Sequence, residues 1–275
     1  MKWSWLVLCA ACSGGGAKKP HVIEDAPAVA KGPAPVPVVP AGPYKVEEKF
    51  DKGDAQIRVE WKDTPVEARA SSGRTACGTA RAAAVAPTTT WGIPDVVVMI
   101  DVNHGKSPTA GSGAGSGSGS GSGSTGGSRV VLEHCAFSPR VAIVESPWIV
   151  ASAMDAPAKV TIGRLGAARP LAIPVAAQKT ATILLPVAGH EAAVALDADS
   201  ITELKSDDDS AIAVVPPTPY YAVTEANGQV VLRDVPVGTF DVAAWLPARA
   251  GQGARAAHGK ITVTTGGLAE VTLSL

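Results

Sequence analysis

The residues of this chain best suited to metal or nucleophilic chemistry are its cysteines and histidines. There are four cysteines and five histidines among 275 residues. Neither Cys77 nor Cys135 belongs to a C-x-x-C pair, so the ligand spacing of a zinc site is absent. The sequence also lacks the G-x-S-x-G and H-E-x-x-H patterns of serine hydrolases and zinc peptidases. We therefore predict that the chain has no catalytic residue, no metal site and no cofactor, and that it is not an enzyme.

Two other groups of side chains suggest binding chemistry. The densest acidic cluster is the run 207–209, with Asp197 and Asp199 nearby, but no D-x-D-x-D-G loop follows it. A solvated turn is therefore favoured over a calcium site. Exposed tryptophans would form a sugar-binding face, although an aromatic content of 4% favours core positions for most of them. The tryptophans in question are Trp61, Trp91, Trp148 and Trp245.

The N-terminus has the layout of an export signal. Lys2 carries a positive charge, and the apolar stretch after it ends in two alanines before Cys12. This pattern resembles the signal of bacterial lipoproteins, except that Cys9 stands where such signals usually have leucine. The resemblance implies that residues 1–11 are removed and that Cys12 is lipidated. A short buried helix ending in two ordinary cysteines is the alternative.

Residues 12–43 are predicted to be a tether. Prolines recur between Pro27 and Pro43 among alanine and valine, which favours a semi-rigid polyproline II spacer. A tail without a spacing role is the alternative. Acyl chains would hold the protein on a bacterial membrane, because each buried methylene contributes about 0.8 kcal/mol. The expected location is therefore the cell envelope, with the outer membrane favoured over the inner one, facing the periplasm or the exterior.

Loss of Cys9 with the signal and lipidation of Cys12 leave two cysteines, Cys77 and Cys135. Exported proteins reside in an oxidising compartment, where two remaining thiols commonly pair. We therefore predict a Cys77–Cys135 disulfide, with a metal site or a reactive thiol as the alternative. In the chain-entropy account such a crosslink stabilises the fold by about 4 kcal/mol.

The folded part has the hydrophobic pattern of strands. Gln56–Trp61 and Lys260–Thr264 alternate polar and apolar residues, which is typical of strands with one buried face. The segments Pro65–Ala70 and Thr79–Ala86 form at most a turn or two of helix. Many short strands separated by turn residues predict an all-β fold of two β-sandwich units. Further strands are expected at Val96–Ile100, Val130–Leu132, Val141–Val144, Lys159–Ile162, Thr182–Leu185, Ala192–Leu196 and Ile212–Val215.

The Gly/Ser-rich tract 110–128 is predicted to be a flexible loop insert, because it offers no side chains to bury in a core. It separates the strand that ends near Val102 from the strand that starts at Arg129, in the place of a hairpin loop. We expect a first β-sandwich domain over residues 44–215, which contains this insert, and a second over residues 216–275.

Residues 224–245 contain the most specific pattern of the chain. Asn227 and Gly228 predict a type I′ hairpin turn, and Pro236–Gly238 predicts a second turn before a strand of alternating apolar residues. Together with two further strands expected in Gly259–Leu275, this pattern resembles the carboxypeptidase regulatory-like (transthyretin-like) β-sandwich module. The resemblance implies a non-catalytic module that assists the folding, packing or attachment of a neighbouring domain.

Within residues 44–215, the strand after Asp54, the pair Cys77-Gly78, and the segments Ile93–Ile100 and Cys135–Val141 together resemble, more weakly, the cupredoxin-like domain. This resemblance raises the question of a copper site. Blue copper requires two histidines, one cysteine thiolate and usually a methionine. Cys135 has no histidine or methionine shortly after it, and as strand neighbours His134 and Cys135 would face opposite sides. We expect a scaffold whose metal site has been lost. The donors that would have to converge are His104, His134, His190, Cys135 and Met154.

The net charge and the hydropathy of the chain limit the classes of partner that we expect. The 24 basic and 25 acidic side chains give a net charge of −1, which argues against nucleic acid. No apolar run reaches the roughly 18 residues of a membrane-spanning helix. We predict a non-enzymatic lipoprotein whose β-sandwiches act as a structural module or bind an extracytoplasmic protein or glycan. The alternatives are a copper-binding, cupredoxin-like electron-transfer protein and a carbohydrate-binding accessory module.

Overall fold

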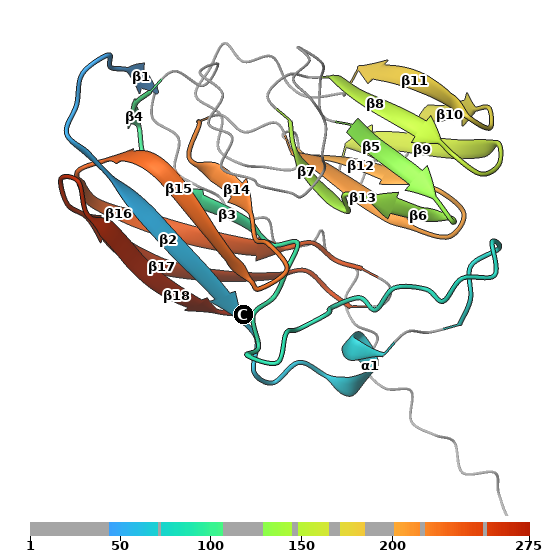
Figure 1. Cartoon of the computed structure of the whole chain (residues 1–275), viewed down its shortest axis with the longest axis horizontal. Coiled ribbons are helices and arrows are strands. Elements are labelled where there is room, and N and C mark those ends of the chain that lie inside the picture. The colour runs from blue at the N-terminus through green and yellow to red at the C-terminus, as the bar shows by residue number, and fades with distance from the viewer. Residues whose placement is uncertain are drawn as a thin grey trace, which may run out of the picture. The chain divides into compact units, whose positions relative to one another are not determined.

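The structure is a computed structural model that describes most of the chain after residue 43. In the segments it describes, α1 (Val66–Arg69) is the only helix and the other regular elements are strands (Figure 1). This confirms the all-β fold class. All of these segments belong to one compact unit, residues 33–275. The described segments are 44–70, 73–106, 129–144, 148–164, 171–184, 201–214, 218–249 and 252–275.

Several expectations concern residues outside the described segments. These are the signal over residues 1–11, the lipidation of Cys12, the tether over residues 12–43 and the Gly/Ser-rich tract 110–128. They stay predictions. Among the described residues, no helix has the length and hydropathy that crossing a bilayer would require.

Strands from the beginning and the end of the described chain form one β-sandwich, here called sandwich A. Its four-stranded sheet has the order β14-β3-β16-β17, and its three-stranded sheet has the order β15-β2-β18. The parallel ladder between β1 (Lys45–Val46) and β4 (His104–Gly105) adjoins it. The strands of sandwich A are β2 (Lys52–Glu60), β3 (Val97–Ile100), β14 (Tyr221–Val223), β15 (Gln229–Pro236), β16 (Gly238–Leu246), β17 (Arg255–Val263) and β18 (Leu268–Ser274).

The alternation of β2 explains its place in this sandwich. Ala55, Ile57 and Val59 are fully buried, whereas the residues between them reach the surface. A strand of this pattern packs one face against a core and exposes the other face to solvent. β2 pairs antiparallel with β15 and parallel with β18, and Figure 1 shows it in blue among the orange and red strands from the end of the chain.

The pairing of β2 and β3 corrects the domain boundary expected between residues 215 and 216. Both strands precede that boundary, yet β2 lies between β15 and β18, and β3 lies between β14 and β16. Sandwich A is therefore discontinuous, with residues 129–214 inserted in it. Local periodicity identifies a strand and its buried face, but it does not encode which distant strand will pair with it.

The inserted residues form a second β-sandwich, here called sandwich B. One sheet has the order β10-β9-β12-β13-β7 and the other has the order β11-β8-β5-β6. Apolar side chains from both sheets form a core of their own, with Leu204 and Ala213 fully buried. The strands are β5 (Arg129–Glu133), β6 (Ala136–Ser138), β7 (Val141–Ile143), β8 (Trp148–Ala153), β9 (Ala158–Arg164), β10 (Leu171–Val175), β11 (Lys179–Leu184), β12 (Ile201–Lys205) and β13 (Ser210–Val214).

A third apolar cluster joins the two sandwiches. Val98 of β3 faces the core of sandwich A, whereas Val97 and Met99 pack with Trp245 against side chains of sandwich B. The partners from sandwich B include Ile212 of β13. Both faces of the β14-β3-β16-β17 sheet are therefore covered at β3, which explains why every residue of β3 is buried.

The expected strands are confirmed, apart from Ala192–Leu196, which lies outside the described residues. Pro65–Ala70 contains the single helical turn α1, and Thr79–Ala86 contains no helix. In the strand after Gly238, Val242 and Ala244 are buried in the core of sandwich A, as predicted from their alternation.

The turn at Asn227 and Gly228 differs from the type I′ hairpin that we expected. Only Gly228 has a positive φ, 76°, and its amide donates to the Glu225 carbonyl over 2.8 Å. This geometry fits a type I turn followed by a left-handed glycine. The strands on either side, β14 and β15, belong to different sheets. The turn therefore connects two layers rather than two hydrogen-bonded neighbours.

Candidate functional site

Cys77 and Cys135 form the predicted disulfide. Their sulfur atoms are 1.97 Å apart and their Cα atoms 5.8 Å apart, across a sequence separation of 58. Cys77 lies in the loop before β3, and Cys135 lies in the turn between β5 and β6, so the bond links sandwich A to sandwich B. It also corrects the alternatives of a metal-bound or reactive thiol, because neither sulfur is free.

The turn that carries Cys135 has an unusual backbone. His134 and Cys135 have φ values of 49° and 63°, a left-handed conformation that non-glycine residues rarely adopt. The His134 amide donates to a carboxylate oxygen of Asp155, and Thr79 Oγ1 donates to the His134 carbonyl over 3.0 Å. The expectation that His134 and Cys135 are alternating strand residues is therefore wrong, since both belong to a turn fixed on several sides.

Three polar side chains gather at this turn. His134 Nδ1 lies 3.3 Å from Asp155 Oδ2, and His134 Nε2 lies 3.8 Å from Glu133 Oε1. One potential ligand atom from each residue lies within 4.8 Å of the others. All three side chains are exposed, so the group is open to solvent. We call these residues, Glu133, His134 and Asp155, the β5–β6 triad.

Parallel pairing of two strands creates the triad. β5 and β8 run parallel, with Leu132 opposite Ala153, so their carboxyl ends lie at the same edge of the sheet. Glu133 is the last residue of β5 and His134 follows it, whereas Asp155 follows the end of β8. Sequence reasoning missed the triad because Asp155 has no informative spacing from His134, and the parallel register was not foreseen.

The other residues considered for copper do not complete a blue-copper site. Cys135 is bonded to Cys77 and cannot act as a thiolate. His104 lies in β4, where its Nδ1 is 3.0 Å from Asn103 Oδ1. Met154 is 39% exposed, and His190 lies outside the described residues. The donor set of the described residues thus does not fit blue copper.

The acidic run 207–209 is more than the solvated turn that we expected. Asp208 accepts hydrogen bonds from the Ala76 amide over 2.9 Å and from Arg81 Nη2 over 2.5 Å, and its side chain is 9% exposed. Asp209 accepts from the Phe137 amide over 2.8 Å. The loop before β3 is therefore attached to sandwich B by Asp208 as well as by the disulfide.

A second polar group lies at the end of sandwich A where the described chain begins. Tyr44 Oη donates to the Lys106 carbonyl over 2.6 Å, and the Lys106 amide donates to Tyr220 Oη over 3.3 Å. Lys106 Nζ donates to the Arg233 carbonyl over 2.7 Å. Burial lowers the pKa of Lys106 and raises the pKa values of both tyrosines. These groups satisfy one another and fasten the chain segment that precedes β2.

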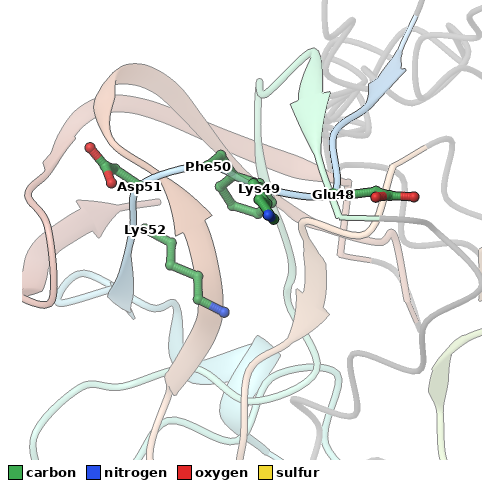
Figure 2. A pocket seen from close by; sticks show the side chains of 5 residues that line it. All are labelled: Glu48, Lys49, Phe50, Asp51 and Lys52. Atoms are coloured by element: carbon green, nitrogen blue, oxygen red, sulfur yellow. The ribbon is translucent and has the colours of Figure 1, made fainter.

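Two open hollows adjoin this segment. One, of about 640 Å³, is lined by Tyr44, Lys45, Glu47, Asn103 and His104. The other, of about 530 Å³, is lined by consecutive residues, 48–52, and Figure 2 shows the side chains of Asp51 and Lys52 pointing in different directions. Since all the lining residues of the second hollow come from one stretch of chain, it lacks the convergence typical of a ligand site.

The tryptophans divide between core and surface. Trp61 and Trp245 are 2% and 0% exposed, so neither contributes to a sugar-binding face. Trp91 is 38% exposed, with the guanidinium of Arg69 5.8 Å from the centre of its ring. The side chain of Trp148 is not among those that the structure describes.

Comparisons with family models, curated proteins and solved structures found no match to this chain.

Proposed function

We propose that the protein is a non-enzymatic lipoprotein of the bacterial cell envelope. In this proposal Cys12 carries the lipid, residues 12–43 space the folded part from the membrane, and the two sandwiches act as a structural or binding module. The resemblances to lipoprotein signals and to the carboxypeptidase regulatory-like module motivate this assignment. The partner we expect is an extracytoplasmic protein or a glycan.

One observation carries the structural half of the proposal, namely that the sandwiches are fastened to each other by several kinds of contact. A covalent bond at Cys77 and Cys135, an ion pair between Arg81 and Asp208, and the apolar layer around Trp245 all cross between them. A disulfide across a long loop suits a protein that works in an oxidising compartment. A body braced in this way is suited to presenting a surface at a fixed geometry.

The lipid anchor is tested by a Cys12→Ser variant of the full chain, with Cys9→Ser as the matched control. Cells are labelled with a fatty-acid analogue and then separated into membrane and aqueous fractions. We expect label and membrane association in the wild type and in Cys9→Ser, and neither in Cys12→Ser. Label and membrane association retained in Cys12→Ser would contradict the proposal.

A carbohydrate-binding accessory module is the second candidate, and the exposure of Trp91 favours it. Aromatic rings that stand free of the core are the usual platforms on which sugar rings stack. A glycan array comparing the wild type with Trp91→Ala tests this candidate. We expect bound glycans to disappear with Trp91→Ala, and an array on which the wild type binds no glycan would eliminate the candidate.

A further inference from the structure

We propose that the β5–β6 triad binds a divalent transition-metal ion, with zinc as the representative ion. In this assignment His134 Nδ1 and Asp155 Oδ2 are the direct ligands. Glu133 accepts a hydrogen bond from His134 Nε2–H and so orients the ring. The proposal departs from our expectation that the chain binds no metal, and it is independent of the proposed lipoprotein function.

The spacing of the two direct donors fits such an ion. Zinc binds histidine nitrogen and carboxylate oxygen at about 2.0–2.2 Å, and a tetrahedral angle then places the two donor atoms about 3.3 Å apart. The observed distance from His134 Nδ1 to Asp155 Oδ2 is 3.3 Å. The imidazole and carboxylate need little movement to bind the ion together.

The position of Glu133 fits the role of supporting carboxylate. A metal-bound histidine commonly donates its other ring N–H to a carboxylate, which fixes the tautomer and increases the basicity of the ligand nitrogen. Glu133 Oε1 is 3.8 Å from Nε2, on the side of the ring opposite Asp155. A small rotation of the Glu133 side chain closes this distance to a hydrogen bond.

The charge of the triad provides a second, separate argument. Within the described part of the chain, the ion pairs of Glu133 and Asp155 involve only His134, and no lysine or arginine. Other carboxylates are neutralised by such side chains, for example Asp208 by Arg81 and Glu60 by Arg58. Two carboxylates held close together without a permanent cation repel each other, and a bound cation relieves that repulsion.

The surroundings hold the donors in place before an ion arrives. Cys135, next to His134, is covalently attached to Cys77, and the Asp155 carboxylate already accepts the His134 amide. Positioning of ligands by their supporting contacts reduces the ordering that binding requires. Two protein ligands leave coordination positions open to water or to a group from outside the chain.

The test is a calorimetric titration of the full chain with Zn²⁺, comparing the wild type with single variants. Asp155→Asn keeps an oxygen acceptor for the His134 amide while it removes the charge. We expect one Zn²⁺ per chain, an affinity at least tenfold weaker in His134→Gln and Asp155→Asn, and a loss of several-fold in Glu133→Gln. His258→Gln, which changes an exposed histidine of β17, is the matched control and is expected to bind as the wild type does.

Thermal unfolding of each variant accompanies the titration, so that lost binding is separated from lost structure. His134→Gln alters a side chain that is 65% exposed and should leave the unfolding midpoint close to that of the wild type. Wild-type affinity in a folded His134→Gln variant would overturn the proposal. So would the absence of wild-type zinc binding up to millimolar concentration.

Discussion

Arg249 Nη1 donates to Asp95 Oδ2 across 3.0 Å, and the two partners differ greatly in burial. The Arg249 side chain is 5% exposed and the Asp95 side chain is 31% exposed. Burial and the nearby charge of Arg140 lower the pKa of Arg249, whereas Asp95 raises it. In the described part of the chain Arg249 Nη2 has no hydrogen-bond partner. Asp209 also raises the pKa of Arg249, but by less than Asp95 does, so the charge of this arginine is balanced mainly by Asp95.

This asymmetry predicts unequal effects from removing each partner. Asp95→Ala leaves a buried guanidinium without its counter-ion and should reduce the free energy of unfolding by about 3 kcal/mol. Arg249→Met leaves a carboxylate that water can reach, so a loss of about 1 kcal/mol is expected. Urea unfolding of both variants measures the two effects. Equal losses would show that the burial difference has no energetic consequence.

The disulfide provides a second prediction. Replacing Cys77 and Cys135 together by serine frees a loop of 58 residues in the unfolded chain, and the chain-entropy relation gives a loss of about 4 kcal/mol. The double variant is compared with the wild type in urea, with and without reductant. Reductant should shift the wild-type midpoint toward that of the variant and leave the variant unchanged. Coincident midpoints of the oxidised wild type and the variant would contradict the prediction.

Two glycines with similar backbone angles should respond differently to alanine. Gly228 has φ +76° and an added Cβ would lie 2.4 Å from the Ile93 amide nitrogen, whereas Gly266 has φ +66° and open space. Gly266→Ala should cost about 1 kcal/mol for the left-handed backbone alone. Gly228→Ala adds a clash with main chain that cannot rotate away, so a total of about 3 kcal/mol is expected. Thermal unfolding of Gly228→Ala and Gly266→Ala in the same buffer measures the two losses of stability.

The contacts of Glu60 predict part of the way in which the free energy of unfolding depends on pH. Its carboxylate lies 2.6 Å from Arg58 Nε, and this hydrogen bond holds the pKa of Glu60 below its ordinary value despite partial burial. Because the folded state binds the Glu60 proton less tightly than the unfolded state, the stabilisation is present at neutral pH. It is lost as the pH falls through the folded pKa.

The test is Glu60→Gln, followed by urea unfolding across the acid range. The variant should lose about 1 kcal/mol at neutral pH, a value kept small because both side chains are partly solvated, and should match the wild type once Glu60 is protonated. Glu270→Gln, which changes an exposed residue of β18, is the control and should leave the curve unchanged. A constant offset between Glu60→Gln and the wild type at every pH would refute the assignment.

Local pattern was sufficient for much of the fold and for the disulfide. The alternation in β2 and β17 identified strands and their buried faces, and cysteine counting, made on the prediction that the chain is exported, identified the pair Cys77 and Cys135. What the sequence could not supply was pairing between distant strands. The place of β2 between β15 and β18, and the parallel register of β5 and β8 that assembles the β5–β6 triad, both depend on contacts without a local signature.

The same limit explains the misjudged polar residues. The run 207–209 has the acidic composition of a surface turn. Asp208 pairs with Arg81 because the loop before β3 lies against it, and that contact has no signal in the local sequence. Asn227 and Gly228 have the composition of a hairpin, but the strands that they connect pair with β3 and β2 instead of with each other. The positions of the turns predicted from composition are therefore correct, whereas the geometry and the contacts predicted for them are wrong.

The parallel ladder between β2 and β18 has a consequence for biogenesis. A polypeptide that leaves the ribosome or the export channel N-terminus first delivers β2 early, while both of its hydrogen-bonding neighbours are still to come. Until Gln229–Ser274 has emerged, β2 presents two open edges, which are the sites where unrelated strands add and aggregates begin. Sandwich B, in contrast, is complete by residue 214. We therefore expect sandwich B to fold before sandwich A, and β15 and β18 to protect both edges of β2 only once they have been made.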